Sequence, residues 1–347
     1  MKKRSIKAIF SIALAVVLMT TCIIVDRIGN VNAESVDAKV KYHFLNVNSI
    51  KIEGTDNPIG SADCIIIEDN VGDSRVITIV DTGYNDAGSW NKVVDYCNDL
   101  EIETIDNLII THPHNDHHGG VPELCKNFDI TRCYYTLPAD WSKVRPQEMD
   151  WASKATSDWA MQALLEKINS DGTGVDMISP DEEGEYYPIS DESGFTVYNC
   201  LAVVKNNYRE PEFNDFSMMI KYTYGEVDAL LTGDINIQYE YVLTGQVDKD
   251  GNRVAQGSAD AIAPVGEIEI FKLPHHGTEG SLSTDAFFSA MNPNNKPFYA
   301  IITGYRPNIG ASTITRCNNH GYDVKVTHDG DIRVWTDGTN FTWEQDI

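Results

Sequence analysis

The chain has 347 residues, which is enough for one large domain or two smaller ones. Its apolar (42%), aromatic (10%) and charged (23%) fractions are those of a globular protein and exclude a collagen-like, coiled-coil or wholly disordered chain. The 27 Lys and Arg residues against 52 Asp and Glu residues give a formal net charge of −25. Because polyanions are bound mainly by clustered Lys and Arg, this charge argues against broad, non-specific nucleic-acid binding.

The first 33 residues are predicted to be an export signal. Basic residues between Lys2 and Lys7 precede an uncharged apolar run, residues 8–25, and Val31-Asn32-Ala33 has the small residues that a signal peptidase recognises. We favour cleavage after Ala33 over the alternative that residues 8–25 stay as a membrane anchor, although the run approaches membrane-spanning length. In both cases residues 34–347 are expected to be extracellular. Without the leader, 22 basic residues face 51 acidic ones, and the charge becomes −29.

The exported body is predicted to alternate strands and helices. Strands are expected at residues 40–48, 64–68, 75–80 and 107–110, and a helix with Trp90, Val93, Val94 and Cys97 on one face precedes the last of these. Residues 134–190 form a loop- and helix-rich elaboration with a helix near 149–168, in which Trp151 and Trp159 are expected in the core. Further strands are expected at 195–204, 217–224, 227–231 and 267–273, and residues 298–343 return to strand, helix and strand. This alternation predicts one layered α/β domain over residues 34–347.

The cysteines are scattered over the exported body without a CxxC pair. We expect most of them to be small buried apolar side chains, and a Cys125–Cys133 disulfide stays open as an alternative.

A histidine-rich loop follows the predicted strand at 107–110. In His112-x-His114-x-Asp116-His117, the first two histidines can bind one divalent ion while Asp116 and His117 bind another. Six of the nine histidines of the chain lie in residues 112–118 and 275–276, a concentration that solvated loop histidines do not explain. The sequence therefore predicts a site for two divalent ions, zinc or manganese.

Two later strand ends carry groups for the same site. The strand at 227–231 ends on Thr232-Gly233-Asp234, whose carboxylate could bridge two ions. The strand at 267–273 leads into Pro274-His275-His276-Gly277. We expect His275 to bind metal and His276 to lie near the substrate or behind the ligands, and the sequence also allows the reverse assignment.

These motifs, in this order, resemble the metallo-β-lactamase superfamily, most closely the hydrolase-like domain of the ComEC competence protein and its stand-alone secreted relatives. The resemblance covers residues 40 to about 340 and includes Val80-Asp81-Thr82-Gly83, Asn214-Asp215-Phe216-Ser217 and Lys272-Leu273-Pro274-His275-His276-Gly277. It implies a four-layer αββα sandwich with a two-metal site at one edge.

The resemblance also implies a role for each site residue. His112 and His114 would bind one ion, Asp116, His117 and His275 the other, and Asp234 would bridge them. Asp81 would be a buried carboxylate that orients the loop histidines. Where many members supply a further histidine, this chain has Asn214 and Ser217 behind the ligands, so the first ion is expected to be held weakly.

The function expected from this site is hydrolysis by a metal-bound hydroxide. Asp116 or Asp234 would take the proton, and Lys272 or His276 would assist. The resemblance favours a phosphodiester in a nucleic acid, a cell-wall polymer or a small molecule, and the acidic body favours a small or locally held substrate. The alternatives are a lactonase or ester hydrolase on the same site and an exported binding protein that has lost catalysis.

Overall fold

The computed structural model describes residues 38–47, 60–71, 74–136, 154–180, 184–198, 212–237, 239–240, 265–278 and 283–346. The predicted leader, Trp151 and Cys200 lie outside these ranges. Within them, no helix combines the length and apolar character needed to cross a membrane.

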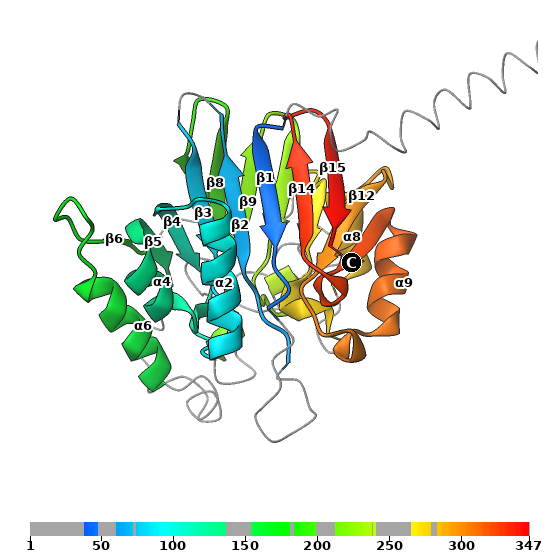
Figure 1. Cartoon of the computed structure of the whole chain (residues 1–347). Coiled ribbons are helices and arrows are strands. Elements are labelled where there is room, and N and C mark those ends of the chain that lie inside the picture. The colour runs from blue at the N-terminus through cyan, green and yellow to red at the C-terminus, as the bar shows by residue number, and fades with distance from the viewer. Residues whose placement is uncertain are drawn as a thin grey trace, which may run out of the picture.

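Two β-sheets form the centre of the molecule (Figure 1). The first has eight strands in the order β15-β14-β1-β2-β3-β4-β5-β6, and the second has seven in the order β13-β12-β11-β10-β9-β8-β7. The strands of the first sheet are β1 (Val40–Phe44), β2 (Ile65–Asp69), β3 (Val76–Val80), β4 (Thr104–Ile110), β5 (Asp129–Tyr135), β6 (Asp176–Ile178), β14 (Ile332–Thr336) and β15 (Phe341–Gln345). Those of the second sheet are β7 (Glu185–Pro188), β8 (Ser193–Tyr198), β9 (Met219–Tyr224), β10 (Val227–Leu231), β11 (Ile270–Lys272), β12 (Phe298–Ile302) and β13 (Tyr322–Val326).

Helices cover the outer face of each sheet. The helices on the first sheet are α2 (Ala87–Asp99), α4 (Val121–Asn127) and α6 (Lys154–Glu166), and those on the second are α8 (Asp285–Met291) and α9 (Ala311–Asn319). The shorter turns are α3 (Asn115–His118), η3 (Phe213–Phe216), η4 (Pro274–Gly277), η6 (Arg306–Asn308) and η7 (Thr327–Asp329).

Three apolar clusters confirm the predicted four-layer αββα sandwich. The middle cluster joins side chains of both sheets, such as Ile67 and Leu231. A second joins the first sheet to its helices and contains Val93 and Cys97 of α2, on the face that the helical spacing predicts. The third joins the second sheet to α8 and α9. Each fully buried aliphatic side chain stabilises the fold by roughly 1.5–3 kcal/mol, so these clusters hold the layers together.

The registers of parallel strands bring the predicted site segments to one edge. Val80 at the end of β3 pairs with Ile109 of β4, so Asp81 and the histidine loop leave the first sheet side by side. Leu231 at the end of β10 pairs with Lys272 of β11, so Asp234 and η4 leave the second sheet together. Parallel neighbours end at the same sheet edge, which is where open α/β sheets place ligands.

The structure also corrects one expectation, on Trp159, and decides one alternative that the sequence left open, on the cysteines. Trp159 is 37% exposed on α6 and does not lie in the core, because helical spacing alone does not show which face a neighbouring layer covers. Cys125 and Cys133 are both free and buried, so they form no disulfide. The other described cysteines, Cys64, Cys97 and Cys317, are free and buried as expected.

Candidate metal centre

The histidine loop turns sharply after β4 through the single helical turn α3, for which His114 is the N-cap. Glycine is required just behind this turn: a Cβ on Gly119 would lie 2.1 Å from the backbone nitrogen of Asn85. The amide of Gly119 also donates a hydrogen bond to the carbonyl of Gly83 (3.0 Å). The loop is therefore packed against the segment after β3 and holds its side chains in fixed directions.

Asp81 orients His117, the role that the resemblance implies for this buried carboxylate. Nδ1 of His117 donates to Oδ2 of Asp81 (2.7 Å), and the backbone N–H and hydroxyl of Thr111 donate to the same carboxylate (2.8 and 2.7 Å). Asp81 has a φ of 59°, a left-handed conformation that non-glycine residues rarely adopt outside constrained sites. Its bond to Nδ1 turns Nε2 of His117 toward the second sheet.

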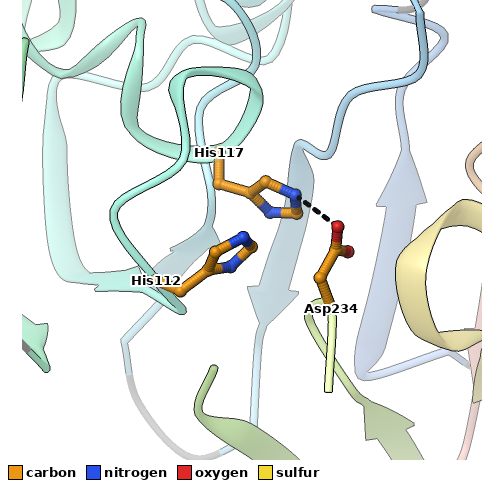
Figure 2. Close-up of side chains that lie close together, drawn as sticks. All are labelled: His112, His117 and Asp234. Carbon is orange, nitrogen blue, oxygen red and sulfur yellow. Dashed lines mark ion pairs between the residues drawn. The ribbon is translucent and has the colours of Figure 1, made fainter. Parts of the chain in front are cut away.

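Four ligand atoms converge between the sheets. Nε2 of His117 lies 3.4 Å from Oδ2 of Asp234, the ion pair drawn in Figure 2, and 4.0 Å from Oδ2 of Asp116. Nε2 of His276 lies 3.4 Å from both of these carboxylate oxygens. Ligands bound tetrahedrally at zinc distances lie roughly 3.3–3.6 Å apart. The three separations of 3.4 Å fit one divalent ion, and the separation of Asp116 and His117, at 4.0 Å, is wider.

The polar atoms of this cluster support the same conclusion. Within the described part of the chain, Nε2 of His117, Nε2 of His276 and Oδ1 of Asp234 are buried and make no hydrogen bond. Buried polar groups without hydrogen bonds are rare and costly, and a metal ion satisfies them.

His112 and His114 form a second, looser group beside the first. Nε2 of His112 lies only 2.8 Å from Nδ1 of His114, which is hydrogen-bonding distance and shorter than the separation of two tetrahedral ligands. His112 also clusters with His117 and Asp234 within ligand reach, and Figure 2 shows these three side chains pointing toward one another. The two groups together can hold two ions, with Asp234 belonging to both.

Ser217 and Asn214 lie in the segment where many superfamily members supply a further histidine and this chain does not. Oγ of Ser217 lies 3.3 Å from Nδ1 of His112 and accepts a hydrogen bond from the backbone N–H of Asp234 (2.8 Å). Ser217 therefore supports a ligand from each sheet. Asn214 is buried in η3, and its Oδ1 makes no hydrogen bond to any residue that the structure describes.

The two histidines of η4 occupy different environments. His275 and His276 have φ values of 49° and 55°, two successive left-handed residues that direct their rings apart. His276 is 2% exposed and lies in the ligand cluster. The side chain of His275 is 37% exposed, with Nε2 3.9 Å from Oδ2 of Asp234. This geometry favours the reverse of the assignment that the resemblance implies.

Lys272 is completely buried behind the cluster. Its ammonium donates to the carbonyl of Gly233 (2.8 Å), pairs with Asp63, and lies 3.6 Å from Oδ1 of Asp234. The pKa of Lys272 is raised because Asp63 and Asp234 outweigh the effect of burial. The lysine therefore stays charged but does not reach the open side of the site.

Buried carboxylates dominate the electrostatics of the centre. Burial by itself lowers the pKa of a histidine, yet Asp234, Asp81 and Asp116 raise the pKa of His117 well above its ordinary value. His276 behaves in the same way, chiefly through Asp234 and Asp63. His112, in contrast, has a pKa well below its ordinary value, first because of burial and then because of the neighbouring histidines. The site thus attracts positive charge of the kind that a divalent cation supplies.

Sequence reasoning missed Asp63 and Thr111. Asp63 lies in the loop before β2, is 1% exposed, and its Oδ1 accepts a hydrogen bond from Nδ1 of His276 (3.1 Å). Thr111 precedes the first histidine and holds Asp81. The available signal for Asp63 was its position directly before an apolar strand. Its partner His276 lies 213 residues further along the chain, so the sequence does not show the contact.

Comparisons with known proteins agree with this architecture. A family model described as the metallo-beta-lactamase superfamily matches residues 58–286, more than half of the chain. No curated protein sequence matches the chain.

Several solved structures resemble the fold at low identity. MEM-A1, a subclass B3 metallo-beta-lactamase isolated from a soil metagenome library, is 10% identical with a TM-score of 0.34, over 58% of this chain and 62% of that one. The Rm3 metallo-beta-lactamase is 14% identical with a TM-score of 0.33, over 58% and 64%. A diphosphatase from the PhnP family is 11% identical with a TM-score of 0.42, over 84% and 96%. The chain thus spans less than two thirds of the length of the two β-lactamases, and these distant likenesses carry no conclusion about activity.

Proposed function

The chain belongs to the metallo-β-lactamase superfamily, and we propose that it is a metal-dependent hydrolase that cleaves phosphodiesters outside the cell. The fold and the ligand clusters imply divalent metal binding. The observation that carries the proposal is the convergence of His117, His276, Asp116 and Asp234 from both sheets at the spacing of one ion's ligands, with His112 and His114 beside them.

We assign the ligands from these contacts. Asp116, His117 and His276 would hold one ion, His112 and His114 the other, and Asp234 would lie between them. His276 replaces His275 in this set because its Nε2 faces both carboxylates from a buried position. A divalent ion of the zinc or manganese class supplies Lewis acidity and lowers the pKa of a bound water to about 7.

The remaining groups have roles that follow from their positions. Oδ2 of Asp116 and of Asp234 face the cluster, and either can accept a proton released there; Asp116 is also partly open to solvent. The partly exposed imidazole of His275 lies at the rim, where it can contact a substrate. Lys272 is buried against Asp63 and Gly233, so its charge acts on the site from behind.

The charge of the site is compatible with a phosphodiester, the substrate class that the sequence resemblance favours. The carboxylates of Asp63, Asp81, Asp116 and Asp234, less the ammonium of Lys272, carry a formal charge of −3. Two divalent ions would change this to +1 and the metal-bound hydroxide to 0, so the site would not repel the single negative charge of a phosphodiester. The body, at −29 without the leader, offers no excess of basic residues for a long polyanion, which favours small or locally held substrates.

We also propose that residues 1–33 direct export, with cleavage after Ala33 or attachment to the outer face of the membrane through residues 8–25. The basic head, apolar run and small residues support this proposal. Mass spectrometry of the mature protein tests it: a chain beginning at Glu34 indicates cleavage, and a cell-bound chain that retains Met1 indicates an anchor. An intact chain found only in the cytoplasm would contradict export.

The activity is tested by measuring hydrolysis of bis-nitrophenyl phosphate, a lactone and single-stranded DNA, each with added Mn²⁺ or Zn²⁺. We expect turnover of the small phosphodiester, loss of that turnover in Asp116→Ala, and unchanged turnover in Asp171→Ala, a control at an exposed turn. Turnover of the lactone alone would favour the ester hydrolase, and less than one bound ion per chain would favour a binding protein without catalysis. Full activity of Asp116→Ala would refute the site assignment.

A further inference from the structure

We propose that Asp63 and Lys272 form a buried positioning pair that fixes the ligands of one sheet relative to those of the other and thereby sets the metal affinity of the site. This inference rests on the proposed metal-dependent function and assigns positioning roles to two residues outside the ligand set given above, of which Asp63 also lies within ligand reach of His276 and Asp234. It follows from the contacts of Asp63, from those of Lys272, and from the way the ligands are divided between the sheets.

Asp63 connects three loops of the site. Its backbone N–H donates to the carbonyl of Asp116 in the histidine loop (3.1 Å), and its own carbonyl accepts from Gly83 (2.8 Å), two residues after Asp81. Oδ1 accepts from Nδ1 of His276 (3.1 Å), which points Nε2 of that ring at Asp116 and Asp234. Outer carboxylates of this kind fix the orientation of a metal-binding imidazole.

Lys272 makes the matching contacts from the second sheet. It is the last residue of β11, and its ammonium pairs with Asp63 and donates to the carbonyl of Gly233 (2.8 Å), directly before Asp234. The ammonium also lies 3.6 Å from Oδ1 of Asp234. One cation therefore holds both the Asp63 loop of the first sheet and the Asp234 loop of the second.

The division of ligands explains why such a pair is needed. Asp116 and His117 come from the first sheet, whereas Asp234 and His276 come from the second. A small sliding of one sheet against the other would separate the four ligand atoms. At 0% and 1% exposure, Lys272 and Asp63 are both shielded from water, so their attraction is strong and directional while neither can contact a substrate. They are positioning residues.

The test is the affinity for Zn²⁺, measured on purified protein by competition with a chromophoric chelator. The variants are Asp63→Asn, Lys272→Met and the double substitution. The matched control is Asp69→Asn: Asp69 ends β2, the strand that Asp63 precedes, is 1% exposed like Asp63, and accepts hydrogen bonds from Ser193 and Tyr222 away from the ligands. Circular dichroism establishes that each variant is folded at the temperature of the measurement.

We expect each single substitution to weaken Zn²⁺ binding about 10–100-fold, the usual cost of losing an outer partner of a metal ligand. The double variant should bind Zn²⁺ at least as tightly as the single variant with the lower affinity, because the two residues act as a unit. Asp69→Asn should lower stability and leave Zn²⁺ affinity unchanged. If a single variant does not fold, the double variant is measured instead, because it removes both charges of the pair. The proposal then requires the double variant to bind Zn²⁺ about 10–100-fold more weakly than wild type.

Three results would overturn the proposal. They are wild-type affinity in the pair variants, a double variant whose loss equals the product of the two single losses, and an equal loss of affinity in Asp69→Asn. This inference alone would be refuted if the wild-type protein binds Zn²⁺ and hydrolyses phosphodiesters while the pair variants bind Zn²⁺ equally well. Wild-type protein that binds neither Zn²⁺ nor Mn²⁺ would refute the proposed function as well.

Discussion

Replacing each histidine of η4 by alanine separates their roles. His276 places Nε2 3.4 Å from two carboxylate oxygens of the cluster, and its other ring nitrogen is held by Asp63. His275 lies farther from the cluster, with Nε2 3.9 Å from Oδ2 of Asp234 and with a side chain that is 37% exposed. We therefore expect His276→Ala to remove a metal ligand and His275→Ala to remove a group at the rim.

The expected magnitudes follow from this difference. Loss of an outer partner of a metal ligand already costs roughly 10–100-fold in affinity, so loss of the ligand itself should cost more than about 100-fold, or about 2.7 kcal/mol. His275→Ala should change metal affinity by less than about 10-fold, and its effect should appear in KM, because a group that contacts the substrate equally in the ground and transition states contributes uniform binding.

The assay combines metal content, chelator competition and steady-state hydrolysis of bis-nitrophenyl phosphate. His320→Ala is the matched control, since that histidine stacks on Phe288 and pairs with Asp285 at a helix end. If His275→Ala loses the ion while His276→Ala keeps it, the assignment drawn from ring orientation is wrong and the one implied by the resemblance is right.

Three further predictions follow from the described contacts. Asp81→Asn should lower metal affinity about 10-fold or more, because the charge that holds His117 and Thr111 is lost; unchanged affinity in a chelator titration would contradict this role. Burial raises the pKa of Glu240 to about 7, so its protonated form stabilises the fold fully below pH 4.5, and this stability is lost as the pH rises through 7. Glu240→Gln should therefore be more stable than wild type at pH 8 by roughly 1–3 kcal/mol and similar at pH 4, as measured by urea denaturation; an equal difference at both pH values would exclude this titration. Chelation of the metal should lower the Tm, and re-addition at 100 times the Kd should restore about 2.7 kcal/mol, as followed by calorimetry; a Tm independent of metal would argue against a bound ion.

The sequence predicts most of the fold because its signals are local. Apolar runs and helical spacing indicated β2, β3, β4, β10 and α2 to within a few residues, and the four-layer sandwich followed from the resemblance. The histidine loop is also local, since its ligands lie within six residues of one another.

Features that depend on distant contacts or on backbone conformation were not predicted from the sequence. Asp63 becomes part of the site only through a residue 213 positions away. Which of His275 and His276 faces inward depends on the left-handed backbone conformation of both residues. Only glycine adopts this conformation readily, so two histidines in the sequence do not predict it. Trp159 shows the same limit in packing, because its exposure depends on what covers α6.

The division of the ligands between two sheets also fixes the order in which the protein matures. During synthesis the histidine loop exists well before Asp234 and His276 are made, and at that stage it offers only the ligands of one sheet. A complete site rarely exists in an unfolded chain, so tight metal binding has to wait until β11 has joined the second sheet and the sandwich has closed. We therefore expect metal uptake to be a late step of folding, and a bound ion to mark a chain whose two halves have assembled.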